Sequence, residues 1–404
     1  MSSRGVLDGF TVVEVSTGAS APYGARLLAD WGARVVKVER PGGDVSREWD
    51  TVCNGLSAGF VWLNRNKESI VLDLRREDAR DALRRLVARA DVLLHNYLDH
   101  TASRLGFSYE HVREWKPDVV YCQISGYGRT GPYAEMKAYD LLMQGETGVL
   151  AMTGSEDAMA KVPLSICDLT TGSFAANAIQ GALIHRLRTG EGQAIHVSMF
   201  ASMMDWLGYF PYFYWHRGRL PEREGAKHHL LTPYGPYETS DAHYVNLAVL
   251  SQEHWVRFCR DVLEDEELAA DVRFDTNEHR IANRAELESF IAERVLEDDQ
   301  ATWIERLERS QIPWGRVNRL DEVLAHPALA ASGQLKAVES ARGLLPTMDN
   351  PVVWSTTANR LDRVPELGEH TSSVLAELEF SDGEIDSMLG AADLQPIATE
   401  PRTE

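Results

Sequence analysis

The sequence lacks the features that assign many chains to a class at once. Its four cysteines, Cys53, Cys122, Cys167 and Cys259, are scattered and form no CxxC pair, which argues against a zinc site or a disulfide framework and favours a reducing cytoplasm. No apolar run is long enough for a transmembrane helix, and no signal peptide is recognisable. Basic residues number 41 against 61 acidic ones, and the net charge of -20 argues against general binding to nucleic acid or to a membrane surface.

Several nucleotide and catalytic motifs are also missing. Walker A, HExxH and GxSxG do not occur, and nothing predicts a metal site. The first turn after a predicted strand, residues 16–22 (STGASAP), lacks the GxGxxG spacing that lets a backbone approach a pyrophosphate. Glu39, which ends the second predicted strand, is followed at once by Arg40. A dinucleotide-dependent dehydrogenase is therefore a poor interpretation of this chain.

What is present favours an α/β protein of two domains. The chain has 404 residues, which is too long for one compact core, and its 44% hydrophobic and 25% charged content is ordinary for a soluble globular protein. Short apolar runs alternate with segments of helical periodicity, which predicts a doubly wound, Rossmann-like parallel sheet. The predicted strands are residues 10–15, 34–39, 69–73, 91–95, 119–124 and 194–198, and the predicted helices between them are residues 22–31, 77–89 and 174–188.

The pattern changes near residue 200, where an aromatic-rich helical segment at 206–215 leads into a polar stretch. Accordingly, we expect four regions along the chain. These are a large Rossmann-like domain at 1–200, a linker at 201–224, a smaller α+β domain at 225–330, and a return segment at 331–404 that completes the large domain. The acidic tail after Leu394 is expected to be mobile.

Asp168 is the most informative single residue. It follows the apolar run 162–167, and a small-residue segment and the predicted helix come after it. A carboxylate beside a helix N-terminus can cap the helix, or it can act as a nucleophile that forms a covalent acyl intermediate. Cys167 adjoins it, but neighbours in an extended strand point to opposite faces, so we expect Cys167 to be structural. The remaining motifs favour the nucleophile.

Ten blocks of sequence carry a resemblance to a known family. They include residues 7–15 (LDGFTVVEV), 28–41 (LADWGARVVKVERP), 64–74 (NRNKESIVLDL), 124–132 (ISGYGRTGP) and 188–193 (RTGEGQ), together with 21–22, 42–47, 95–97, 139–140 and 167–168. In this order and spacing they resemble the family III CoA-transferases (the CaiB/BaiF group), which include formyl-CoA transferases, carnitine CoA-transferase and α-methylacyl-CoA racemases. The resemblance covers nearly the whole chain and is weakest after Arg217.

The resemblance implies a fold, a dimer and a reaction. It implies a large α/β domain that is built from both ends of the chain and binds coenzyme A (CoA), a small domain, and two chains interlocked as a homodimer. It also implies that CoA moves from an acyl-CoA donor, with succinyl-CoA a candidate, to a small carboxylic acid. Asp168 occupies the position of the catalytic aspartate, which forms an aspartyl–acyl anhydride and then an enzyme–CoA thioester. Acyl-CoA enters as a substrate, and no metal is implied.

The resemblance also assigns residues to the CoA site. Seven positions match residues that contact the nucleotide, its phosphates or the pantetheine path: Arg40, Leu72, Arg75, Asn96, Tyr97, Arg104 and Lys137. Arginine and lysine at strand ends suit the phosphate charges of CoA, and arginine can bind phosphate with two parallel hydrogen bonds.

The substrate end of the site shows departures from the family. Thr17, Gly18 and Ala19 occupy a turn where some formyl-CoA transferases carry polar side chains. The loop 232–236 is the candidate oxyanion-binding turn, but it lacks the glycine run of some relatives. The other candidates for substrate contact are Trp49, Arg129, Asp140, Tyr234 and Gly235, and Arg129 suits an acid with a second carboxylate.

The alternative function is that of an α-methylacyl-CoA racemase or epimerase. A racemase needs a base and an acid on opposite faces of the α-carbon, and racemases of this family usually carry His-Asp where this chain has Tyr139-Asp140. The missing histidine favours the transferase. Asp140 is then expected to be structural or to orient the substrate.

Overall fold

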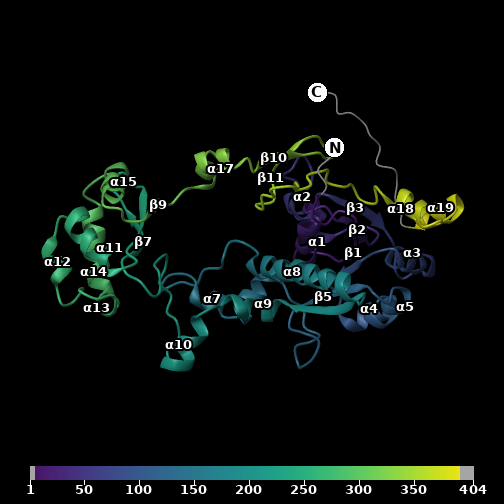
Figure 1. Ribbon diagram of the computed structural model, residues 1–404, viewed down its shortest axis with the longest axis horizontal. Helices are drawn as coiled ribbons and strands as arrows, with labels where there is room; N and C mark the ends of the chain where they lie inside the picture. Colours follow the sequence, from purple (N-terminus) through teal and green to yellow (C-terminus); the bar gives the residue numbers. More distant parts are fainter. Residues whose placement is uncertain (1–4, 392–404) are drawn as a thin grey trace. The chain divides into compact units, whose positions relative to one another are not determined.

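The computed structural model describes residues 5–391, which form two compact units (Figure 1). The first unit holds the described residues up to 147, residues 162–208 and those from 330 on. The second unit holds 148–161 and 209–329. The chain therefore leaves the first unit and returns to it twice. The tail after Leu394 lies outside the described residues.

A six-stranded parallel sheet forms the centre of the first unit. Its strands are β1 (Thr11–Val15), β2 (Arg34–Glu39), β3 (Lys67–Val71), β4 (Val92–His95), β5 (Val120–Ser125) and β6 (Gln193–Ser198). The order across the sheet is β3-β2-β1-β4-β5-β6, and every pairing is parallel. The predicted Rossmann-like parallel sheet is thus confirmed. The order reverses direction between β1 and β4, which is where open α/β sheets bind ligands.

Helices cover both faces of this sheet because alternate strand residues point to opposite sides. One face packs on α1 (Ser20–Asp30) and α8 (Ile166–Thr189) through a cluster that includes Val12, Leu28 and Ile179. The other face packs on α3 (Glu77–Ala88), α4 (Asp99–Leu105), α5 (Tyr109–Trp115), α18 (Thr371–Glu377) and α19 (Asp382–Ala391). The last two helices, yellow in Figure 1, bring the end of the chain back to strands made near its beginning.

The remaining elements of the first unit are short. They are η1 (Val45–Glu48), α2 (Ala58–Asn64), α6 (Asp140–Glu146), α9 (Met199–Trp206) and the antiparallel hairpin β10 (Leu335–Val338) and β11 (Leu345–Met348). The hairpin contributes Val338 and Leu345 to a small apolar cluster with Phe60 of α2. Among the described residues, no helix is long and apolar enough to cross a membrane.

The second unit has its own core of helices around a three-stranded antiparallel sheet. The strands are β7 (Tyr234–Glu238), β8 (Tyr244–Ala248) and β9 (Trp314–Arg316), in the order β7-β8-β9. The helices are α7 (Val149–Met152), α10 (Phe210–Arg217), α11 (Gln252–Arg257), η2 (Phe258–Val262), α12 (Glu266–Ala270), α13 (Asn277–Ala282), α14 (Arg284–Val295), α15 (Gln300–Arg309) and α16 (Leu320–Leu324). A further helix, α17 (Pro327–Ser332), spans the return to the first unit. Trp255 and Trp303 are fully buried in the core of the second unit.

Among the predicted elements that differ from the structure in their bounds, three have an instructive difference. Strand β3 begins two residues earlier than predicted. Its first residue, Lys67, has a charge typical of a loop, but it is buried in the strand because it forms an ion pair with Glu14. Helix α8 begins at Ile166 and not at residue 174. The single helix predicted at 206–215 is interrupted, since α9 ends at Trp206 and α10 begins at Phe210, with Gly208 between them at φ 59°.

Candidate active site

Asp168 lies in the first turn of α8, not at the end of a strand. The helix cap position is Ser165, and the Asp168 side chain accepts its hydrogen bond from another helix, so the interpretation of Asp168 as a cap is wrong. Cys167 points into the protein and is fully buried, and burial raises the pKa of its thiol to about 12. Cys167 is therefore a neutral packing residue, as expected.

Ser20, the first residue of α1, is the direct partner of Asp168. Its Oγ donates a hydrogen bond of 2.5 Å to Oδ1 of Asp168, and Ser20 itself is 5% exposed. Burial raises the pKa of Asp168 to about 6, the Ser20 bond lowers it in part, and the nearby Asp140 carboxylate raises it. Above that pH Asp168 is an anion held in a mostly dehydrated place, which is a suitable state for a carboxylate nucleophile.

Asp140 holds the start of α8 from outside the helix. Its Oδ1 accepts a hydrogen bond of 2.8 Å from the backbone N–H of Cys167 and a longer one of 3.5 Å from that of Asp168. Its Oδ2 accepts a bond from Gln144, one turn later on α6. A helix N-terminus has unsatisfied N–H groups, and Asp140 supplies an acceptor for them. The Asp140 side chain thus contacts the backbone of the turn that carries Asp168.

Two glycines allow Ser20 and Asp168 to meet. Gly24 lies one turn after Ser20, and Gly172 lies one turn after Asp168. A Cβ added to Gly172 would lie 2.4 Å from the carbonyl oxygen of Ser20, and one added to Gly24 would lie 2.8 Å from that of Gly172. The two helix backbones are therefore in direct contact, and only glycine fits at both positions. This close approach lets two short side chains form one hydrogen bond.

The turn between β1 and α1 is fixed by two side chains from loops that follow β2 and β4. Asn96, which follows β4, donates from Nδ2 to the Thr17 carbonyl (2.7 Å) and accepts from the Thr17 N–H (3.2 Å). Asp44 Oδ1 accepts bonds from the Gly18 N–H and from the Thr17 hydroxyl. Ala19 then leads directly into α1 and Ser20. The predicted residues 17–19 and Asn96 are thus brought together at the point where the strand order reverses.

A buried charge network lies behind this turn. Lys37 Nζ contacts Glu14 Oε1 at 2.9 Å and Asp44 Oδ2 at 2.8 Å, and all three side chains are fully buried. Lys67 Nζ contacts the other oxygen of Glu14 at 2.7 Å. Burial opposes the charge of Lys37, but its carboxylate neighbours outweigh burial and raise its pKa; in return Lys37 helps to lower the pKa of Asp44 to about 2. Lys37 and Asp44, which support the turn, therefore stay ionised throughout the physiological pH range, whereas burial lowers the pKa of Lys67 to about 8.

A cavity of about 330 Å³ opens at the carboxyl ends of β1, β2 and β3. It brings together four of the residues assigned to CoA: Arg40, Leu72, Arg75 and Tyr97. Arg75 is exposed and held by both oxygens of Asp73, and Arg40 Nε donates to the Gly43 carbonyl. Leu72 gives the cavity an apolar wall beside two guanidinium groups. An aromatic base and negatively charged phosphates fit such a lining.

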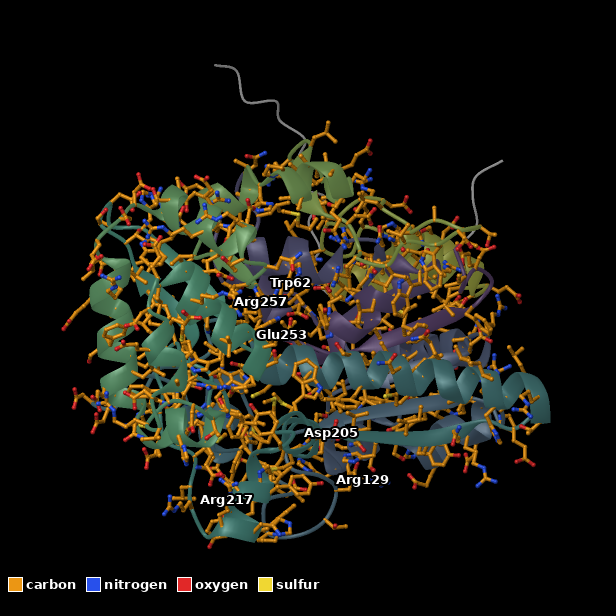
Figure 2. The ribbon with its side chains drawn as sticks, turned by 60° about the vertical axis from the view of Figure 1, so that its left-hand side comes forward. Trp62, Arg129, Asp205, Arg217, Glu253 and Arg257 are labelled. Atoms are coloured by element: carbon orange, nitrogen blue, oxygen red, sulfur yellow. The ribbon has the colours of Figure 1, made fainter. Side chains whose placement is uncertain are left out.

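The other predicted CoA and substrate positions of the first unit are spread more widely. Arg104 is exposed on α4, next to Leu105 of the cavity, and Lys137 is exposed on the loop before α6. Trp49 is 51% exposed and packs over Gly59. Arg129, labelled in Figure 2, lies on the loop after β5; its Nε binds Asp99 at 2.9 Å, and it lines a separate cavity of about 110 Å³. Asp168 does not line that cavity.

Tyr234 and Gly235 belong to the second unit, where they begin β7. The ring of Tyr234 stacks on His228 with centroids 4.8 Å apart. Thr232, which starts this loop, donates from its hydroxyl to Glu288 at 2.6 Å, and Lys227 binds the other oxygen of Glu288 at 2.7 Å. The loop 232–236 is thus held by a charged anchor on α14.

Two residues of this site were not identified from the sequence, Ser20 and Asp44. Ser20 lies in the small-residue turn that the sequence analysis recognised, but nothing local distinguishes it from Ser16. Asp44 lies in the block 42–47 that carries part of the family resemblance. Both owe their importance to contacts with distant segments. Within residues 5–391, no cluster of three histidine, cysteine or acidic side chains is arranged to hold a metal ion.

Comparison with known proteins gives consistent matches along the chain. Residues 7–371 match the family model described as CoA-transferase family III. A succinate–glutarate CoA-transferase from Agrobacterium fabrum is 35% identical over 384 residues, covering 92% of this chain and 96% of the relative. A succinyl-CoA:mesaconate CoA-transferase from Haloarcula hispanica is 34% identical over 392 residues, covering 94% and 98%. The crystal structure of a CAIB/BAIF family protein from Brucella suis superposes with a TM-score of 0.82 at 35% identity, covering 93% of this chain and 100% of that one.

Proposed function

Because this chain belongs to CoA-transferase family III, a family of enzymes, we propose that it moves CoA from a dicarboxylic acyl-CoA such as succinyl-CoA to a second small dicarboxylic acid. The observation that carries the proposal is the state of Asp168. Its carboxylate is mostly buried and bound at Oδ1 by Ser20, and no described residue of this chain donates to Oδ2. An anion with one bound and one open oxygen is suited to attack a thioester carbonyl.

The reaction proceeds through two covalent states of Asp168. Oδ2 attacks the thioester carbon of the donor, and CoA leaves as a thiolate, which gives a mixed anhydride. The thiolate then attacks the Asp168 carbonyl carbon and expels the donor acid, which leaves CoA bound to the enzyme as a thioester. The acceptor carboxylate repeats these steps in reverse order and leaves as the new acyl-CoA. The thioester free energy is conserved because water takes part in none of these steps.

The position of the cavity suits the extended shape of CoA, which carries its nucleotide and its sulfur at opposite ends. Val15 at the end of β1 lines the cavity that contains Arg40 and Arg75, and Ser20, five residues later, touches Asp168. Five residues span at most roughly 17 Å, so the turn between β1 and α1 can contact both the nucleotide end and the thioester end of one acyl-CoA molecule. We assign the nucleotide to the cavity and the thioester to Asp168.

The choice of acids follows from the relatives. Their names specify succinate or succinyl-CoA together with glutarate or mesaconate, and the free acids succinate, glutarate and mesaconate each carry two carboxylates. A second carboxylate on the acceptor needs a cation or several N–H donors. Trp49, Arg129, Tyr234 and Gly235 remain the candidates for this recognition. Arg129 already pairs with Asp99, so an acid that bound it would have to compete with that carboxylate.

We also propose that the enzyme is an interlocked homodimer. Apolar side chains of the first unit are exposed on the isolated chain, with Ile184 57% and Leu187 71% exposed on α8, and Leu141 and Leu142 half-exposed on α6. Such side chains mark interaction surfaces. Light scattering should give twice the 45.2 kDa mass of one chain. A monomer at micromolar concentration would contradict the dimer but not the transferase reaction.

Mass spectrometry tests the reaction directly. The purified protein is incubated with succinyl-CoA and a mixture of small carboxylic acids that includes glutarate and mesaconate. We expect a new CoA thioester from the wild type and none from Asp168→Ala, which should still bind acyl-CoA. Unchanged exchange in Asp168→Ala would refute the covalent mechanism. Deuterium uptake at the substrate α-carbon in D₂O without CoA exchange would instead establish the racemase.

A further inference from the structure

We propose that Ser20 is a second catalytic residue, whose hydroxyl stabilises the negative charge that develops on Oδ1 of Asp168 whenever the carbonyl carbon of that side chain is attacked. The inference rests on the proposed transferase function and goes beyond it, because it names the group that stabilises charge on the enzyme's own carbonyl. Such a donor is needed, since the Asp168 carbonyl carbon is attacked twice in each turnover, first by CoA thiolate and later by the acceptor carboxylate.

The contact geometry suits this role. Ser20 Oγ lies 2.5 Å from Oδ1, and its only other close side-chain acceptor in the described residues is the Met199 sulfur at 4.0 Å. A thioether is a weak acceptor, so the hydroxyl proton has one strong acceptor, which is Oδ1. Ser20 is 5% exposed, so little water competes for its hydroxyl. The donor is therefore in place before charge develops.

The backbone contact between α1 and α8 fixes this donor. Gly24 and Gly172 bring the two helices together one turn away from the Ser20–Asp168 bond. Asp140 holds the first turn of α8 through the N–H of Cys167. Neither helix can move away without breaking one of these contacts. A preorganised donor costs no reorganisation when the transition state forms, which is the condition for effective electrostatic stabilisation.

The step at the enzyme carbonyl can be written atom by atom. CoA thiolate forms a C–S bond to Cγ of the anhydride, and the C=O electron pair moves to Oδ1, which becomes an oxyanion bound by the Ser20 hydroxyl. The oxyanion collapses, the C=O bond re-forms, and the bond from Cγ to Oδ2 breaks. The donor acid leaves as a carboxylate that contains Oδ2. One negative charge passes from sulfur to Oδ1 to the leaving carboxylate, and Ser20 keeps its proton.

This geometry makes the two oxygens of Asp168 unequal. Oδ2 departs with the donor acid, and an oxygen of the acceptor carboxylate replaces it when the cycle ends. Oδ1 stays on the enzyme as long as Ser20 prevents the carboxylate from turning over between cycles. An acceptor acid labelled with ¹⁸O in its carboxylates should therefore place one ¹⁸O atom in the peptide containing Asp168, however many turnovers follow.

The first test compares Ser20→Ala with Ser202→Ala, which removes the hydroxyl of a similarly buried serine on α9 that donates to a backbone carbonyl. We expect Ser20→Ala to lose about 100-fold or more in kcat, as for the loss of one oxyanion donor, with KM for acyl-CoA nearly unchanged. The low-pH limb of the pH–rate profile of Ser20→Ala should move to higher pH, because Asp168 loses the hydrogen bond that favours its ionised form. Ser20→Thr should recover part of the rate, and Ser202→Ala should behave as the wild type.

The second test counts the ¹⁸O atoms in the peptide that contains Asp168, and the wild-type count can by itself overturn the proposal. The wild type should gain one ¹⁸O atom, and Ser20→Ala should move toward two over an equal number of turnovers. Two results would overturn the role of Ser20 without touching the proposed transferase function. One is a rate of CoA exchange in Ser20→Ala within a few-fold of the wild-type rate. The other is the gain of two ¹⁸O labels by the wild type as quickly as one. Absence of CoA exchange in the wild type would overturn the proposed transferase function, and this inference with it.

Discussion

Replacing Asp168, the proposed nucleophile, should stabilise the protein while abolishing the proposed reaction. The change is Asp168→Asn, which keeps the shape of the side chain and removes its charge. The pKa of Asp168 in the folded chain is raised from 3.8 to about 6, so the folded state disfavours the carboxylate anion that the unfolded state accepts freely. Above pH 6 the native protein therefore holds an unfavourable charge, and the variant does not.

The magnitude follows from the size of that shift. Each pKa unit corresponds to about 1.4 kcal/mol, so a rise of roughly two units sets an upper limit near 3 kcal/mol. Because Asp168 retains some contact with solvent, we expect a gain of about 1–2 kcal/mol at pH 8. The sign is fixed by linkage: an acid with a raised folded-state pKa costs stability above that pKa, and this cost falls as pH drops toward the unfolded value. At pH 4.5 about a third of the gain should remain.

Urea unfolding of the wild type and the variant at pH 8 and at pH 4.5 measures the gain in unfolding free energy at each pH. The control is Asp386→Asn on α19, which removes an exposed carboxylate from the same unit and should leave both unfolding curves unchanged. If Asp168→Asn is no more stable than the wild type at pH 8, or if its gain is equal at both pH values, burial does not hold Asp168 in a costly ionised state. The surroundings of Asp168 would then not make its carboxylate more reactive than an exposed one.

Three further outcomes are expected. Gly172→Ala should lower stability by about 1–3 kcal/mol and reduce CoA exchange, because its Cβ would meet the Ser20 carbonyl at 2.4 Å. Gly181→Ala on the same helix has open space and should be neutral or stabilising. Equal urea midpoints for the two variants would be inconsistent with the backbone contact. Lys37→Met should cost about 3–5 kcal/mol in urea unfolding, since it leaves Glu14 and Asp44 without the cation they share; a loss below 1 kcal/mol would contradict that role. Arg75→Ala should raise KM for acyl-CoA more than it lowers kcat, and Arg84→Ala on α3 should change neither; a pure loss of kcat in steady-state kinetics would place Arg75 in the chemistry.

The parallel sheet could be predicted because its signal is local. A strand buried on both faces is an almost continuous apolar run, as in Val92–His95, and the turns and helices between such runs have their own patterns. The exceptions are instructive. Strand β3 begins with Lys67, whose charge is typical of a loop, and only its ion pair with Glu14 makes it a strand residue. Helix α8 begins eight residues early because its first N–H groups are satisfied by Asp140, a distant residue.

The candidate site was predictable to the same degree. Asp168 could be selected because its sequence block resembles that of a family with a known catalytic aspartate, and Arg40, Leu72, Arg75 and Tyr97 do line one cavity. The Ser20 contact could not be predicted, since it depends on two helices 148 residues apart in sequence at the point of contact. Glycine at positions 24 and 172 is visible in the sequence, but the sequence does not say that these two glycines face each other.

The return of the chain to its first unit has a consequence for synthesis on the ribosome. Val374, Leu375 and Met388 join α3, α4 and α5 on one face of a sheet whose first strand begins at Thr11, so part of that face stays uncovered until nearly the entire protein has left the exit tunnel. The second unit, at 148–161 and 209–329, has its own core and emerges earlier. A nascent chain stalled before residue 371 would therefore leave apolar side chains of this face uncovered, the kind of surface that chaperones bind and that drives aggregation.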